Sequence, residues 1–210
     1  MPESQVHGFA WEDHIKKEVY KIQEKAMYTR KHDIDAHENT IDNCAVSIKT
    51  SGGMAVDMGD AQRIFEATGG EPFHMVVIQY DQTEGQKILQ AVLEVDLTGA
   101  RALLFGDLTW EEISEFHAHL KRIPAGRVEN KDYLIRSSEL NKRSKDIQLR
   151  PKVDSKTQRR LQCSFPNIDF FCKNYPERLL YKNQEGVFKS VQLIKTLESG
   201  RRVRHPKTHE

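Results

Sequence analysis

The sequence lacks any long run of apolar residues, and no stretch approaches the roughly 20 that a helix needs to cross a bilayer. Its first residues also lack a basic region followed by an apolar run, which is the mark of a secretory signal. Cysteine is scarce, since the 210 residues include three, and none of these forms a CxxC pair with metal or redox spacing. We therefore expect a soluble, cytoplasmic protein with reduced cysteines and no membrane partner.

Several catalytic motifs are missing as well. The chain has no Gly-x-Ser-x-Gly elbow, which argues against a Ser/His/Asp hydrolase, and no glycine-rich phosphate loop of the nucleotide-binding kinds. His117 and His119 lie two positions apart on a predicted helix and so face different sides. This spacing argues against a zinc site and leaves carboxylates as the candidate metal ligands.

The composition fits one ordinary globular domain. Hydrophobic residues make up 38% of the chain and charged residues 30%, which argues against wholesale disorder. The net charge of +1 is unevenly distributed, because residues 121–160 and 201–207 are markedly basic. Such stretches are either solvated faces or surfaces that contact an anionic partner.

The first 80 residues alternate between helical and strand patterns. The predicted order is αβββαβ, with segments at 10–27, 33–36, 44–49, 54–58, 61–67 and 74–80. Asp60 is the expected N-cap of the second helix. A helix between the last two strands favours a crossover beside a mixed central sheet, so the predicted fold class is α/β.

The rest of the chain continues this alternation. Thr109 and Glu112 form a capping-box pattern that opens a predicted helix. The other predicted elements are strands at 87–95 and 101–105, a hairpin at 147–152 and 159–165, and a helix at 187–197. We expect a catalytic core at 1–125, a basic recognition extension of the same domain at 126–200, and a mobile basic tail at 201–210.

Acidic and basic side chains occur at positions that share a strand face. Residues two apart project from the same face, so Ser47 and Lys49 point together, as do Asp33 and Asp35. A neighbouring strand lies about 5 Å away, so a carboxylate on one strand can meet a lysine on the next. A hard cation held by carboxylates beside an amine supplies the parts that phosphodiester hydrolysis needs.

Three stretches carry a resemblance to a known family. They are Gln5 to Glu12 at the start of the first helix, His32-Asp-Ile-Asp35, and Val46-Ser-Ile-Lys-Thr-Ser51. Their order resembles the PD-(D/E)xK superfamily and, within it, type II restriction endonucleases. The resemblance implies a restriction-endonuclease-like core with a C-terminal hairpin and helix, and cleavage of double-stranded DNA at a specific sequence with Mg²⁺.

The resemblance also implies roles for individual residues. Asp35 would bind the metal, Lys49 would be the catalytic lysine, and Glu12 would match the acid that many members place on the first helix. Asp33 competes with Asp35 for the metal, and Asp35 is preferred because it lies deeper in the predicted strand.

Ser47 departs from the family pattern, which usually has Asp or Glu two positions before the lysine. A hydroxyl is a poor Mg²⁺ ligand compared with a carboxylate. Glu12 or Asp57 would then supply the missing acid. Two alternatives stay open: a structure-specific or repair nuclease of the same fold, and a DNA-binding protein that has lost catalysis.

The basic hairpin mixes cations with amides, which suits contact with phosphates and base edges. The candidate DNA-binding residues are Lys152, Gln158, Arg159, Arg160 and Gln162. If the segment is a strand, Arg159 and Leu161 share one face, and the opposite face reads the bases. Cutting both strands of a symmetric site is most simply done by a homodimer.

Overall fold

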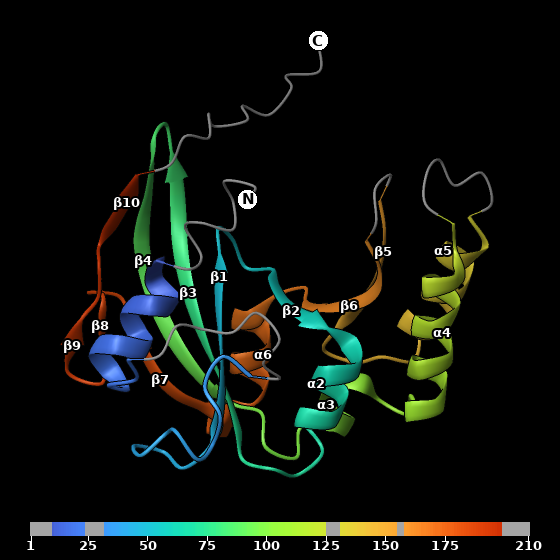
Figure 1. The fold of residues 1–210 in the computed structure, drawn as a ribbon, viewed down its shortest axis with the longest axis horizontal. Helices are drawn as coiled ribbons and strands as arrows, with labels where there is room; N and C mark the ends of the chain where they lie inside the picture. Colours follow the sequence, from blue (N-terminus) through green and yellow to red (C-terminus); the bar gives the residue numbers. More distant parts are fainter. Residues whose placement is uncertain (1–9, 24–31, 125–130, 155–157, 199–210) are drawn as a thin grey trace. The chain divides into compact units, whose positions relative to one another are not determined.

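The computed structural model describes residues 10–23, 32–124, 131–154 and 158–198 (Figure 1). The chain is α/β and forms two compact units that interleave along the sequence. Unit 1 comprises Met1–Gly53, Met75–Val95 and Leu179–Glu210, and unit 2 comprises Met54–His74 and Asp96–Arg178. This division does not follow the predicted boundary at residue 125.

Unit 1 is built on a mixed, five-stranded sheet. Its strands are β1 (Ala45–Ser51), β3 (Phe73–Thr83), β4 (Gln86–Asp96), β10 (Thr196–Glu198) and β7 (Leu179–Asn183). The order is β1-β3-β4-β10, and β7 also pairs with β4. Both β10 and β7 run antiparallel to β4, whereas β1 and β3 run in the same direction (Figure 1). The predicted mixed central sheet is confirmed, and so are the strands expected at 74–80 and 87–95.

The first helix packs on this sheet through the apolar stripe that its sequence predicts. Residues 10–14 are α-helical and continue into a π-helical turn, η1 (Ile15–Val19). Trp11, Ile15 and Val19 are buried in one cluster with sheet residues such as Val76. The predicted helix extends further, but 21–23 are not helical and 24–27 lie outside the described residues.

The end of unit 1 corrects a prediction. Residues 187–197, expected as a helix, form β8 (Val187–Phe188), β9 (Val191–Gln192) and β10. β8 and β9 pair across Lys189 and Ser190, which both have positive φ. A four-residue spacing of apolar side chains fits a two-residue hairpin as well as a helix, and the left-handed turn excludes the helix here.

Unit 2 contains a three-stranded antiparallel sheet in the order β2-β6-β5. Its strands are β2 (Val56–Asp60), β6 (Arg159–Phe165) and β5 (Gln148–Val153). The predicted C-terminal hairpin is therefore confirmed. The third strand of the predicted αβββ order is found but pairs with β6, more than 90 residues away in sequence, rather than extending the first hairpin.

Helices of unit 2 pack on the apolar side of this sheet. They are α2 (Ala61–Ala67), α4 (Trp110–Arg122) and α5 (Asp132–Asn141), with α4 against β6 and α5 against β5. Asp60 caps α2 as predicted, because its carboxylate accepts from the backbone N–H groups of Gln62 and Arg63. The predicted capping box of Thr109 and Glu112 is also confirmed.

Two short helices of unit 2 differ from the sequence prediction. Residues 101–105, expected as a strand, form α3 (Arg101–Phe105), and α6 (Ile168–Asn174) was not predicted. The segment Arg-Ala-Leu-Leu-Phe is rich in good helix formers, and five residues are too few for apolar spacing to distinguish helix from strand.

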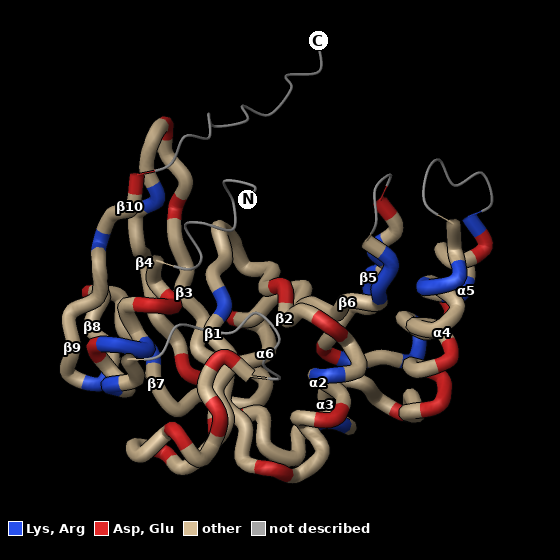
Figure 2. The backbone as a smooth tube through the Cα atoms, viewed as in Figure 1, with Lys and Arg blue, Asp and Glu red and all other residues tan. Residues whose placement is uncertain are grey.

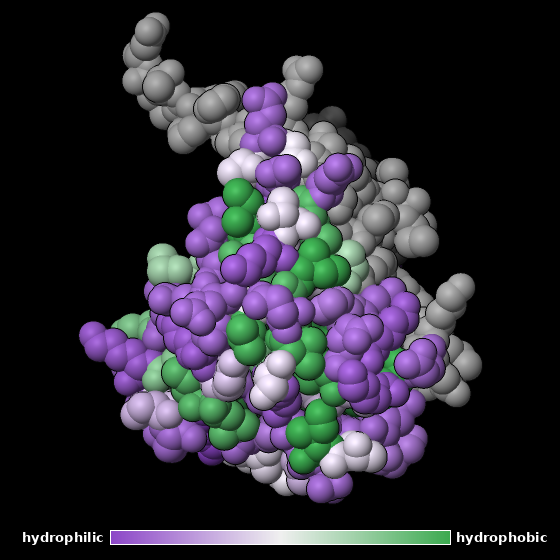
Figure 3. Space-filling model, turned by 90° about the vertical axis from the view of Figure 1, so that its left-hand side faces the viewer, coloured by the Kyte–Doolittle hydropathy of each residue, from purple (hydrophilic) through white to green (hydrophobic). Residues whose placement is uncertain are grey.

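The surface, the helix lengths and the cysteines can be compared with the composition of the chain. The face shown in Figure 3 carries hydrophobic residues interspersed among hydrophilic ones, as exposed surfaces commonly do. In the described part of the chain, no helix has the length and apolar character needed to cross a membrane. Cys44, Cys163 and Cys172, all described, are buried and not joined by a disulfide.

Candidate active site

The first strand of the predicted hairpin is reduced to one isolated bridge. Ile34 pairs antiparallel with Val46 of β1 through two backbone hydrogen bonds. This bridge places the preceding residue, Asp33, opposite Ser47 on β1, since partners in an antiparallel pair step in opposite directions. The following residue, Asp35, already begins a turn in which its carbonyl accepts from the N–H groups of Glu38 and Asn39.

Asp33 is the acid that meets the predicted lysine. Its Oδ2 accepts hydrogen bonds from Ser47 Oγ at 3.0 Å, from the backbone N–H of Ile48 at 2.7 Å, and from Lys49 Nζ at 3.3 Å. The side chains of Lys49 and Asp33 are 22% and 25% exposed, so the pair is sheltered and still reachable from solvent. As predicted, Ser47 and Lys49 project from one face of β1.

Glu12 joins this group from the first helix. Burial raises the pKa of its carboxyl, and the negative charge of Asp33 raises it further, while Lys16 and Lys49 act in the opposite direction. Glu12 also forms an ion pair with Lys16, one helical turn later on the same face. The helix acid, the strand acid and the strand lysine are therefore close enough to act on one another.

The pKa of Asp33 is shifted in the opposite direction, to below its ordinary value. Burial alone would raise its pKa, but the charge of Lys49, the N–H of Ile48 and the charge of Lys16 together lower it. Asp33 is thus held ionised beside a second carboxyl group, on Glu12. We call Glu12, Lys16, Asp33, Ser47 and Lys49 the Asp33 site, and all five residues belong to unit 1.

The donor set of the Asp33 site fits a hard divalent cation. Burial and, after it, the negative charge of Asp33 raise the pKa of Glu12, and a cation held between the two carboxylates would offset both effects. Asp33 and Glu12 would hold Mg²⁺ through oxygen, and Ser47 would contribute at most a hydroxyl. Lys49 would add positive charge where a phosphate could approach.

The structure places the other predicted metal ligands differently. Asp35 lies in the turn that follows the bridge, and its backbone N–H donates to Glu38 Oε2 at 3.3 Å. The preference for Asp35 assumed a longer strand, and the strand pairing at Ile34 alone removes that reason. Asp57 lies on β2 of unit 2, where its Oδ1 accepts from the N–H of Gly59 at 2.8 Å.

Sequence reasoning missed Lys16, which is 3% exposed although it carries a charge. A buried lysine is uncommon unless it is paired, and its partner Glu12 lies four residues earlier on the same helix face. The i,i+4 spacing of the two residues is the signal that could have identified the pair.

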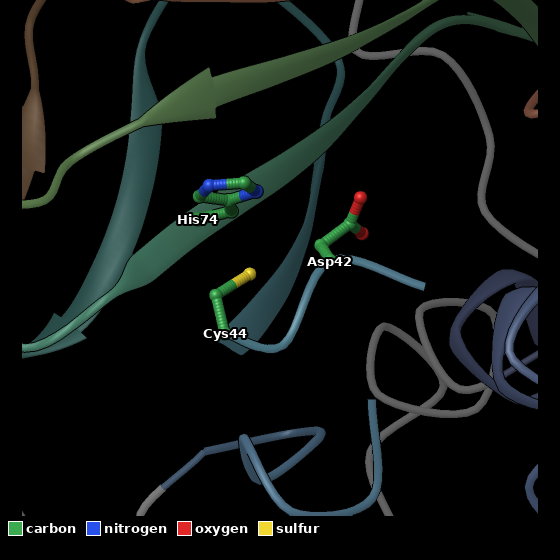
Figure 4. Close-up of side chains that lie close together, drawn as sticks. All are labelled: Asp42, Cys44 and His74. Atoms are coloured by element: carbon green, nitrogen blue, oxygen red, sulfur yellow. The ribbon is translucent and has the colours of Figure 1, made fainter. Parts of the chain in front are cut away.

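A second group of metal-ligating side chains is drawn in Figure 4. It shows Asp42 and Cys44 of unit 1 together with His74, the last residue of the 54–74 segment of unit 2. Asp42 already accepts from Lys189 Nζ at 2.8 Å, and Cys44 Sγ accepts from Asn39 Nδ2 at 3.5 Å. Because His74 belongs to the other unit and Asp42 is paired, the Asp33 site is kept as the candidate metal site.

The candidate DNA-binding residues lie on the hairpin of unit 2, where Figure 2 shows positive charge along β5. Lys152 pairs with Arg160 across the two strands, and Gln162 lies two residues further on the same face. Arg159 lies on the opposite face, and Gln158 precedes β6 and is exposed. The predicted division of the strand into two faces therefore agrees with the observed pairing.

Arg159 is engaged within the protein. Its guanidinium donates to the carbonyl oxygens of Ile123 at 3.0 Å and Pro124 at 2.6 Å, and also to the carbonyl of Asp154. It thereby ties the end of α4 to the hairpin. Among the candidate DNA-binding residues, Arg159 therefore has a structural role, because its guanidinium binds backbone carbonyls of the protein itself.

Comparisons with models of protein families, with curated proteins and with solved structures find no match for this chain.

Proposed function

We propose that the chain is a Mg²⁺-dependent endonuclease that cleaves double-stranded DNA, with a restriction-endonuclease-like core and the Asp33 site as its catalytic centre. The observation that carries the proposal is the contact of one carboxylate, Asp33, with both Ser47 and Lys49, beside a second acid on the first helix. Asp33, Glu12 and Lys49 supply the strand acid, helix acid and lysine that the resemblance to PD-(D/E)xK nucleases implies, with Asp33 in the place predicted for Asp35 and Ser47 in place of the usual second acid.

Each side chain has a defined task in this proposal. Asp33 and Glu12 would hold the cation through carboxylate oxygens. Ser47 fixes the rotamer of Asp33 by donating a hydrogen bond from its hydroxyl to the carboxylate. Lys49 stabilises negative charge on the scissile phosphate. When bound, Mg²⁺ supplies a Lewis acid and lowers the pKa of a coordinated water.

The test is cleavage of supercoiled and linear DNA by the purified protein with Mg²⁺, Mn²⁺ or EDTA. We expect metal-dependent cleavage, abolished in Asp33→Asn and Lys49→Met, because these changes remove a metal ligand and the charge on the phosphate. Asp35→Asn is the matched control and should cut like the wild type. Equal activity of the Asp33 and Asp35 variants would contradict the assignment of the site.

The products distinguish the kinds of nuclease. Discrete fragments from linear DNA indicate a sequence-specific enzyme, whereas a smear, or cleavage confined to damaged or branched substrates, indicates a repair or structure-specific nuclease. A homodimer is part of the sequence-specific proposal, because one symmetric dimer can cut both strands of a symmetric site. If light scattering gives the mass of one protein chain per DNA duplex in the complex, the sequence-specific dimer is contradicted.

A catalytically inactive DNA-binding protein is the second candidate, and Ser47 favours it. The residue offers a hydroxyl where a third carboxylate would bind the ion, and its proton is directed at Asp33. Binding of duplex DNA without cleavage under any metal condition would support this reading over the nuclease.

A further inference from the structure

The sheet of unit 2 has one apolar and one polar face. Its pairing register aligns Leu149 with Cys163 and Pro151 with Leu161 on the face that the helices cover. The opposite face, which we call the polar face, carries Asp57, Gln148, Arg150, Lys152, Arg160, Gln162 and Ser164. A polar face opposite the core is common in antiparallel sheets, but Gln162 and Ser164 of this face are buried rather than solvated.

A pocket of about 520 Å³ opens on the polar face. All three strands line it, with Asp57 from β2, Arg150 and Lys152 from β5, and Gln162 and Ser164 from β6. The volume falls within the range of about 300–1,000 Å³ that is typical of small-ligand sites. It is therefore large enough for a mononucleotide.

Among the described residues, two polar atoms on this face lack a hydrogen-bond partner. Within the described part of the chain, Ser164 Oγ and Arg160 Nε are buried and have no hydrogen-bond partner. Ser164 is 3% exposed and lines the pocket. A buried hydroxyl without a partner costs free energy, and a ligand with a donor or acceptor at this point would remove that cost.

The charges on the pocket are ordered from one end to the other. Asp57 lies opposite Ser164, Arg150 opposite Gln162, and Lys152 opposite Arg160, so Asp57 lies at one end and the two cations lie toward the end at which Asp154 follows β5. Asp154, which also lines the pocket, accepts from the N–H of Gln158 at 3.0 Å and lies 3.8 Å from an Arg159 nitrogen. A ligand with an anionic end and an end that donates hydrogen bonds matches this order.

We propose that the pocket binds a single nucleotide extruded from the DNA. Arg150 and Lys152 would hold its phosphate, and Asp57, Gln162 and Ser164 would hydrogen-bond the edge of its base. Gln162 is 9% exposed and Ser164 less, so these groups are recessed below the surface. A base that stays stacked in a duplex cannot reach recessed groups, whereas a base turned out of the stack can.

The choice of a nucleotide as ligand rests on the proposed function, but binding in the pocket needs neither metal nor cleavage. The chemistry also predicts a preference among bases. A carboxylate accepts hydrogen bonds from the amino groups of guanine, cytosine and adenine, and thymine has no amino group. Deoxythymidine monophosphate should therefore bind most weakly of the four.

The experiment titrates the full chain, in EDTA, with the four deoxynucleoside monophosphates and with inorganic phosphate by calorimetry. We expect the best nucleotide to bind at least tenfold more tightly than phosphate. Lys152→Ala should weaken all four nucleotides, and Asp57→Asn should reduce the difference between them. Ser164→Ala should reduce the affinity for nucleotides relative to inorganic phosphate. It should leave the melting temperature unchanged or raise it, because it removes an unpartnered hydroxyl.

Lys142→Ala, an exposed lysine at the end of α5 and outside the pocket lining, is the matched control and should bind like the wild type. Equal affinity for nucleotides and phosphate, or no effect of the pocket variants, would overturn the proposal. Nucleotide binding that survives in Asp33→Asn, without any DNA cleavage by the wild type, would keep the pocket and reject the nuclease. Cleavage without nucleotide binding would reject the pocket alone.

Discussion

At the scale of single residues, the surroundings of the two acids in the Asp33 site shift their pKa values in opposite directions. The pKa of Asp33 is lowered, so its charged form stabilises the fold above its unfolded pKa, and this contribution is lost as the pH falls through the folded value. The raised pKa of Glu12 has the opposite sign, because its charged form is disfavoured in the folded chain as the pH rises. A cation bound at the site would favour the charged form of Glu12, which burial and the charge of Asp33 disfavour.

The coupling between these two acids gives a prediction that does not depend on catalysis. Replacing Asp33 by Asn should lower the pKa of Glu12, because the negative charge that helps to raise it disappears. A carbon-13 titration of the side-chain carboxyl groups measures this directly. Asp35→Asn is the control and should leave Glu12 unchanged, since Asp35 does not contribute to its shift. A Glu12 titration that is the same in all three proteins would show that the two acids are not coupled.

The Asp33 site also shows how far sequence reasoning reaches at this scale. Strand periodicity could place Ser47 and Lys49 on one face in advance, whereas Glu12 is a candidate only because the resemblance implies an acid on the first helix. The choice between Asp33 and Asp35 could not be made this way. It depends on where strand pairing stops, and one bridge at Ile34 decides it.

At the scale of elements, the end of α3 depends on a glycine. Gly106 has a φ of +66° at the C-cap, and a Cβ there would lie 2.1 Å from the carbonyl oxygen of Arg143. The chain docks here, since the N–H of Lys145 donates to the carbonyl of Leu104 at 3.0 Å. The position thus requires both a left-handed backbone and the absence of a side chain.

Gly99 provides a matched comparison for Gly106. Its φ is +64°, and nothing lies within 4 Å of a Cβ added there. Gly99→Ala should therefore show the conformational cost alone, about 1–2 kcal/mol. Gly106→Ala adds a backbone clash and should lower the melting temperature at least twice as much. Chemical or thermal denaturation of both variants measures this, and equal losses would mean that the segment after α5 is not docked on α3.

The elements that sequence reasoning misassigned were decided by contacts that are distant in sequence. Residues 187–197 were expected to be helical, yet β10 in this stretch pairs with β4, about 110 residues earlier. Local propensity gave correct helices where a cap was present, at Asp60 and Thr109. Where neither a cap nor a long periodic run existed, as at residues 101–105, the pattern could not separate helix from strand.

At the scale of the whole molecule, both units are assembled from separate pieces of the chain. The sheet of unit 1 needs β7 and β10, which follow residue 178, to pair with β4. Lys189 contacts the buried carboxylate of Glu94 at 3.0 Å. Burial alone would lower the pKa of Lys189, but its hydrogen bonds to Asp42 and Glu94 raise it, so the lysine is held charged. Unit 2 likewise needs β6 to join β2 to β5.

This interleaving predicts how the chain responds to truncation at the expected boundary. A fragment of residues 1–125 should not fold cooperatively, because it loses β6 from unit 2 and the buried Phe188 from unit 1. The fragment also lacks Lys189, the ion-pair partner of Glu94. Removing one partner of a buried ion pair typically lowers the free energy of unfolding by about 3–5 kcal/mol. A fragment of residues 1–198 retains every described element and should melt as one transition near the temperature of the full chain. Circular dichroism melts and amide NMR spectra of the two fragments make the comparison. A cooperative melt and dispersed spectrum for residues 1–125 would show that the catalytic core expected there is a domain in its own right.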